Sequence, residues 1–110
     1  MRVAAIDCGT NSIRLLIADL TQNQLIDVSR RMEIVRLGEG VDRTGRLAPA
    51  AIDRTRRALI GYAAEIAELG ITDVRMVATS ATRDATNAAD FRAMVLSVNE
   101  EWTERNLQSA

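Results

Sequence analysis

The sequence contains no histidine and no lysine, and it has one cysteine, Cys8. The lack of histidine excludes a Ser-His-Asp triad, a Cys-His pair, a phosphohistidine intermediate and any histidine-ligated metal site. A single cysteine cannot form an internal disulfide, which agrees with a reducing compartment. We therefore interpret Cys8 as a small apolar residue at a strand end and not as a nucleophile.

Aromatic residues are scarce as well, at 3% of the 110 residues, so aliphatic side chains must form most of the core of what is at most one small domain. No apolar run approaches the roughly 20 residues of a membrane helix. We expect no signal peptide, because Met1-Arg2 leads directly into a strand-like segment, and we expect a cytoplasmic protein without a membrane partner. The formal net charge of −1 gives no overall attraction to nucleic acid, and all 14 basic residues are arginine.

Runs of valine, isoleucine and leucine predict three strands in the first third of the chain, at about 2–8, 12–20 and 25–36. A polar turn at 21–24 separates the second strand from the third. Short connections make consecutive strands antiparallel neighbours. We expect the third strand to end near Leu37, because glycines follow it.

A long helix is predicted over 49–69, with Pro49 in its first turn and Gly70 just after its end. Apolar residues at helical spacing predict its buried stripe: Ile52, Leu59, Ala63 and Ile66. Charged residues of the helix and of the third strand are expected to face water: Arg30, Arg31, Arg54, Arg56, Arg57, Glu65 and Glu68.

The last third of the chain predicts a strand, a short helix and a final helix. Val74 to Ala78 should form a buried strand parallel to the first, because a helix precedes it. A short helix is expected at 81–85. Asp90 is the expected N-cap of a final helix. The apolar side of that helix is expected to carry Phe91, Met94, Val95 and Val98.

The turn Asp7-Cys8-Gly9-Thr10-Asn11-Ser12 lies between the first two predicted strands and combines an acid, a glycine and polar donors. Gly9 allows the backbone to approach an oxyanion closely. The side chains of Thr10, Asn11 and Ser12 can donate hydrogen bonds to it. Asp7 could hold a hydrated Mg²⁺ ion. The alternative is an ordinary polar β-turn, and the six residues alone favour neither interpretation.

A second polar run, Thr79-Ser80-Ala81-Thr82-Arg83, follows the fourth predicted strand. If that strand lies beside the first, Thr79 and Ser80 come close to the first turn, where ligands of open α/β sheets bind. Arg83 could then reach a phosphate with its planar fork of donors. In the structural alternative, Thr79 or Ser80 caps the short helix and Arg83 pairs with Asp84 or Asp90.

Three stretches, taken in order, resemble a known family. They are A-A-I-D-C-G-T-N-S-I-R-L-L-I-A at 4–18, R-L-G-E-G-V-D-R-T-G-R-L at 36–47 and V-A-T-S-A-T-R-D-A-T-N at 77–87. Together they resemble the exopolyphosphatase and guanosine-pentaphosphate phosphohydrolase family, which belongs to the sugar kinase–Hsp70–actin superfamily. The resemblance implies an α/β fold, the incomplete first domain of an actin-like (ribonuclease H-like) protein.

The resemblance also divides the chain and implies an activity. Residues 1–95 would be the N-terminal part of an actin-like phosphate-binding domain, and 96–110 an atypical polar tail that we expect to be partly disordered. The intact enzyme would release terminal phosphate from polyphosphate or guanosine pentaphosphate with Mg²⁺ as cofactor, and the full-length form could be a homodimer. The alternatives are a non-catalytic phosphate-binding or regulatory half-domain and an ATP-dependent kinase of the same superfamily.

The resemblance assigns roles to matching residues of this chain. Asp7 would hold the metal ion, and phosphate would be bound by Gly9, Thr10, Asn11, Ser12 and Arg83. Supporting roles fall to Thr79, Ser80 and Asn87. The segment 36–47 looks architectural, with Glu39 and Arg43 as weaker candidates.

Two parts that the family's chemistry needs are not found in this sequence. One is a catalytic glutamate in a Ser-Gly-x-Glu-Glu-Ala-like stretch, and the other is a second, Asp-x-Gly-Gly-Gly-Ser-like phosphate loop. Glu100-Glu101 has paired acids but lacks the flanking residues. We therefore assign no catalytic residue and expect the chain alone to be inactive.

Overall fold

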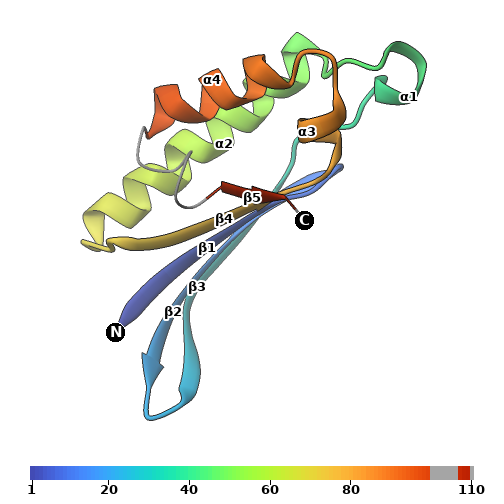
Figure 1. The fold of residues 1–110 in the computed structure, drawn as a ribbon. Coiled ribbons are helices and arrows are strands. Elements are labelled where there is room, and N and C mark those ends of the chain that lie inside the picture. The colour runs from blue at the N-terminus through green and yellow to red at the C-terminus, as the bar shows by residue number, and fades with distance from the viewer. Residues whose placement is uncertain (100–106, 110) are drawn as a thin grey trace.

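In the part of the chain that the structure describes, five strands form one sheet in the order β3-β2-β1-β4-β5 (Figure 1). The computed structural model describes residues 1–99 and the backbone of 107–109. The elements are, in chain order, β1 (Arg2–Cys8), β2 (Ser12–Thr21), β3 (Gln24–Ile34), α1 (Val41–Thr44), α2 (Pro49–Glu68), β4 (Asp73–Ala78), α3 (Ala81–Asp84), α4 (Ala88–Val98) and β5 (Leu107–Ser109). This order confirms the predicted α/β fold class, with three antiparallel strands, a crossover helix and a parallel strand.

β1 is the central strand, antiparallel to β2 and parallel to β4. The last residue of β1, Cys8, is the register partner of both Ile13 and Ala78, so the turn after β1 and the segment after β4 leave the same end of the sheet. At the opposite end, Gln22 and Asn23 connect β2 to β3 with φ angles of 48° and 66°. Two consecutive positive φ angles are typical of tight hairpin turns.

β3 ends at Ile34, so the prediction that it continues to about Leu37 is wrong. Arg36 has a φ of 51°, in the left-handed region. A residue in that conformation turns the chain out of an extended path, and the backbone leaves the sheet there.

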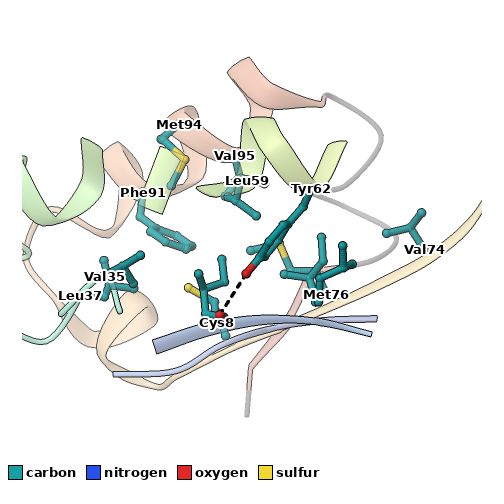
Figure 2. Close-up of a cluster of buried hydrophobic side chains, with 14 of the residues drawn as sticks. Cys8, Val35, Leu37, Leu59, Tyr62, Val74, Met76, Phe91, Met94 and Val95 are labelled. Carbon is teal, nitrogen blue, oxygen red and sulfur yellow. Dashed lines mark hydrogen bonds between the residues drawn. The ribbon is translucent and has the colours of Figure 1, made fainter. Parts of the chain in front are cut away.

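α2 and α4 lie beside each other on one face of the sheet, and the hydrophobic core lies between them and the strands (Figures 1 and 2). The predicted long helix is confirmed, and Gly70 follows it with a φ of 67°. The buried residues of α2 are Ala51, Thr55, Leu59, Tyr62 and Ile66. Of the predicted stripe, Leu59 and Ile66 are therefore buried, whereas Ile52 and Ala63 are half-buried at its margin.

Among the described residues, Tyr62 is the largest fully buried side chain, and it points from α2 to the sheet (Figure 2). Its hydroxyl is hydrogen-bonded to the Ile13 carbonyl oxygen at 3.1 Å and to the Glu33 carboxylate. Burial, and then the bond to Glu33, raise the pKa of Tyr62. The Arg31 guanidinium lies 5.1 Å from the ring centroid and is paired with Glu65 at 3.1 Å. Arg31 and Glu65 were expected to face water, but both are half-buried. Their ion pair joins β3 to α2.

The final helix begins at Ala88 with Asn87 as its N-cap residue, so the prediction of Asp90 as N-cap is wrong. The Asp90 N–H donates to the Asn87 carbonyl oxygen at 2.9 Å, which places Asp90 inside the first turn. A carboxylate is also favourable there, next to the positive end of the helix dipole, so its presence does not mark the cap itself. Phe91, Met94 and Val95 are buried as predicted.

Only part of the predicted polar tail, residues 96–110, is among the residues that the structure describes. Residues 96–98 belong to α4, and the backbone of Leu107–Ser109 pairs in parallel with β4 from Met76 to Ala78. The sequence did not predict this fifth strand. The rest of the tail, 100–106 and 110, lies outside the described residues.

Candidate phosphate-binding site

The turn between β1 and β2, residues 9–11, is referred to below as the phosphate loop. The Gly9 N–H closes it by donating to the Ser12 carbonyl oxygen at 2.9 Å. Among the described residues, nothing accepts a hydrogen bond from the N–H groups of Thr10 and Asn11. Both residues are exposed. Consecutive unpaired N–H groups in a turn form a concavity that suits an anion.

Two carbonyl groups of the phosphate loop, those of Thr10 and Asn11, are by contrast engaged. The Asn11 oxygen accepts from the N–H groups of Val35 and Arg36 at 3.0 and 2.9 Å, and the Thr10 oxygen accepts from the Gly38 N–H at 2.8 Å. A β-carbon on Gly38 would clash with the Thr10 Cγ2 atom, so one of the two residues would have to move. The segment 35–38 therefore supports the loop from one side, in agreement with the architectural role expected for 36–47.

Thr79 supports the phosphate loop from β4. Its N–H donates to the Cys8 carbonyl oxygen at 2.9 Å, and its Oγ1 atom lies 3.2 Å from Thr10 Oγ1, within hydrogen-bond distance. The Thr82 hydroxyl donates to the Thr79 carbonyl oxygen at 2.7 Å. Ser80 is the N-cap residue of α3, without a side-chain capping bond. The structure thus brings the first and third predicted motifs together, as parallel pairing of β1 and β4 requires.

Asp7 is the carboxylate next to the phosphate loop. It is exposed and has Arg14 and Val77 as register partners. In the described part of the chain it has no ion pair, and no cluster of three or more metal-ligating side chains occurs. If the loop binds phosphate, one free carboxylate beside it fits Mg²⁺, which usually takes one or two carboxylates together with phosphate oxygens and water.

Cys8 follows Asp7 but faces the core and is 0% exposed. Burial, with a smaller contribution from the charge of Asp7, raises the pKa of its thiol to about 12. A thiol with that pKa is protonated at neutral pH and unreactive. The interpretation of Cys8 as an apolar residue at a strand end is confirmed.

Arg83 and Asn87, the other residues of the third motif, have partners of their own. Arg83 Nε lies 3.3 Å from Asp84 Oδ1, and the two side chains are 54% and 69% exposed. Asn87 is buried, and its amide accepts from the Leu47 N–H at 2.8 Å and donates to the Leu47 carbonyl oxygen at 2.9 Å. Arg83 therefore forms the pair with Asp84 foreseen in the structural alternative, and Asn87 fixes the loop before α2.

Arg54 is a residue whose contact with the site the sequence did not predict. It lies on α2 and was expected to face water, yet it donates from Nε to the Val35 carbonyl oxygen and from Nη2 to Glu39 Oε2, each at 2.8 Å. Nothing in the local sequence indicates this, because the bonds depend on how α2 packs. Glu39 therefore pairs with Arg54. Arg43 is exposed on α1.

The family model described as the Ppx/GppA phosphatase family matches residues 16–100. The chain belongs to this family. Exopolyphosphatase 2 of Mycobacterium tuberculosis is 59% identical over 101 residues, covering 88% of this chain and 32% of that protein. The bifunctional 3-dehydroquinate synthase/phosphatase of Fusobacterium nucleatum is 43% identical over 95 residues, covering 80% of this chain and 14% of that protein.

Solved structures of the Ppx/GppA family share the fold. The Aquifex aeolicus member superimposes with a TM-score of 0.87 at 35% identity, covering 100% of this chain and 35% of that one. An exopolyphosphatase-like protein gives a TM-score of 0.86 at 40% identity, with 99% and 32% covered. The resemblance seen in the sequence is confirmed, and the chain spans about a third of the length of these solved structures and of the Mycobacterium tuberculosis relative.

None of the helices among the described residues is both long and apolar enough to cross a bilayer.

Proposed function

We propose that this chain is the N-terminal part of an exopolyphosphatase-type phosphohydrolase. Its complete form would release terminal phosphate from inorganic polyphosphate or guanosine pentaphosphate in the cytoplasm. The observation that carries the proposal is the phosphate loop of a Ppx/GppA family member, with two unpaired N–H groups, at Thr10 and Asn11, beside the free carboxylate of Asp7. Polyphosphate is slightly favoured, because nothing in the described residues is suited to a purine.

Each residue of the site would have a simple task. The N–H groups of Thr10 and Asn11, with the Asn11 amide and the Ser12 hydroxyl, would donate to phosphate oxygens. Asp7 would hold Mg²⁺, which when bound neutralises phosphate charge. Arg83 would release Asp84 and bind phosphate instead. The loss of stability would be small, because an exposed ion pair contributes only about 0–1 kcal/mol.

The chain by itself would bind phosphate but have negligible turnover. Hydrolysis needs a group that positions or deprotonates the attacking water and donors on the opposite side of the phosphate. Each is typically worth a factor of about 10² or more. We propose that the remaining two thirds of the complete protein supply both.

The test is phosphate release by the complete protein from polyphosphate and from guanosine pentaphosphate, with Mg²⁺, in wild type and Asp7→Asn. We expect the substitution to lower kcat/KM about 10²-fold or more, because it removes the charge that holds the metal ion. Glu68→Gln is the control, since Glu68 is an exposed acid at the end of α2 away from the loop. Wild-type activity in Asp7→Asn would contradict the proposal, and nucleotide binding without polyphosphate binding would favour a kinase.

A further inference from the structure

The antiparallel ladder between β2 and β3 stops in the middle of a pair. Ser12 is the register partner of Ile34, so Asn11 comes next opposite Val35. The two residues of a hydrogen-bonded pair normally exchange two bonds, one from each N–H group. Here the Val35 N–H donates to the Asn11 carbonyl oxygen at 3.0 Å, but the reverse bond, from the Asn11 N–H, is missing.

The carbonyl oxygen that would complete this pair is occupied by Arg54. The guanidinium donates from Nε to the Val35 oxygen at 2.8 Å, and its Nη2 atom donates to the Glu39 carboxylate at the same distance. The planar fork of an arginine can serve both acceptors at once, which a lysine ammonium on a flexible stem cannot do with the same geometry. The Arg54 side chain is 36% exposed, and its two hydrogen bonds hold it in place on the surface of α2.

The direction of the Asn11 N–H is set by the same segment. The Gly38 N–H donates to the Thr10 carbonyl oxygen at 2.8 Å. That carbonyl and the Asn11 N–H belong to one planar trans peptide and point in opposite directions. The bond from Gly38 therefore directs the Asn11 N–H away from Gly38, toward the open side of the phosphate loop.

We infer that Arg54 is a positioning residue for the phosphate loop, because it fixes the segment 35–39, whose N–H groups hold the Thr10 and Asn11 carbonyl oxygens and so direct the Asn11 N–H toward an anion. The inference deepens the proposed function and rests on it, since it assumes that the loop binds phosphate. Glu39 is the second acceptor that holds the guanidinium in place. Without Arg54, the segment 35–39 would lose the two bonds from the Arg54 side chain, and its N–H groups would hold the loop less firmly.

The first test is amide hydrogen exchange, measured by NMR on the 110-residue chain and on Arg54→Met. We expect the Val35, Arg36 and Gly38 amides to exchange about tenfold faster in the variant, because the segment that carries them opens more readily. A variant that only loosened the fold would exchange faster throughout. Unchanged exchange at these three amides would overturn the inference.

The second test is a titration with inorganic pyrophosphate and Mg²⁺, followed at the Thr10 and Asn11 amides. We expect Kd to rise about tenfold in Arg54→Met and less in Arg54→Lys, which keeps the charge but loses the fork. Arg57→Met is the matched control, since Arg57 lies on the same helix, is 73% exposed and pairs with Asp53.

The outcomes separate the two claims. If wild type binds pyrophosphate and Arg54→Met binds it equally well, the positioning role of Arg54 is wrong and the proposed function stands. If wild type shows no binding at the loop, the phosphate role of the loop is wrong, and the inference falls with it. Should Arg54→Met fail to fold, Arg54→Lys provides the same comparison, and wild-type affinity in that variant would contradict a need for the planar fork.

Discussion

Asp7 and Cys8 are consecutive residues of β1, yet they lie on opposite faces of the sheet. Cys8 is fully buried beneath the helices, whereas Asp7 is exposed on the face that carries no helix in the described part of the chain (Figure 1). The helix-covered face is an aliphatic core. The open face mixes charged residues with exposed apolar ones such as Met32 and Ile34. The helix-covered face therefore provides most of the stability, and Asp7 of the candidate site lies at the end of the open face.

The largest expected effect comes from removing a core side chain. Phe91 is 1% exposed on the covered side, and Met32 is 53% exposed on β3. We expect Phe91→Ala to lower the free energy of unfolding by about 3–5 kcal/mol, because it leaves a cavity. Met32→Ala should change it by no more than about 0.5 kcal/mol. Urea denaturation of both variants measures the difference, and similar losses would contradict the contrast between the faces.

A smaller effect is expected from crowding the contact between Gly38 and Thr10 of the phosphate loop. Gly38→Ala places a β-carbon against the Thr10 methyl group, and we expect a loss of about 1–3 kcal/mol, as for other overpacked sites. Thr10→Ser removes that methyl group and keeps the hydroxyl that faces Thr79. The double variant should therefore recover part of the loss in a double-mutant cycle. Additive effects would show that the two residues do not press on each other.

The smallest effect is a pH dependence that arises from Cys8. Its pKa is raised from 9.0 to about 12 in the folded protein, so the unfolded thiol ionises first as pH rises. The stability contributed by this group is complete below pH 9 and declines by about 1.4 kcal/mol per pH unit between pH 9 and 12. Between pH 8 and 10, Cys8→Ala should lose about 1.4 kcal/mol less than wild type in unfolding experiments. Equal losses would mean that the thiol is not protected by burial.

Much of the fold could be predicted because its signals are local. Apolar runs marked the strands, and Pro49 and Gly70 marked the ends of α2. Two boundaries could not be predicted in this way. The left-handed conformation of Arg36 has no signature in an arginine, and Asn87 and Asp90 are equally good capping residues whose choice depends on tertiary contacts.

The segments that form the candidate site could be predicted from the sequence, but the contacts among their residues could not. The polar turn and the run from Thr79 indicated which segments meet, and parallel pairing of β1 with β4 brought them together. The closeness of Gly38 to Thr10 and the bond from Arg54 to Val35 depend on segments far apart in the sequence, so periodicity and local propensity carry no trace of them. The binding roles of Asp7 and Arg83 stay predictions.

The contact between Thr10 and Thr79 has a consequence for folding kinetics, because 69 positions separate the two residues in the chain. Strands β1 to β3 form a local meander, whereas pairing of β4 with β1 must await the helix between them and closes a long loop. The contacts of the phosphate loop with Thr79 are then among the last to form, whereas those with the segment 35–38 are local. A phosphate ion that bound both this loop and Arg83, as proposed, would bind most tightly once β4 has docked, and would shift the equilibrium toward the completed sheet.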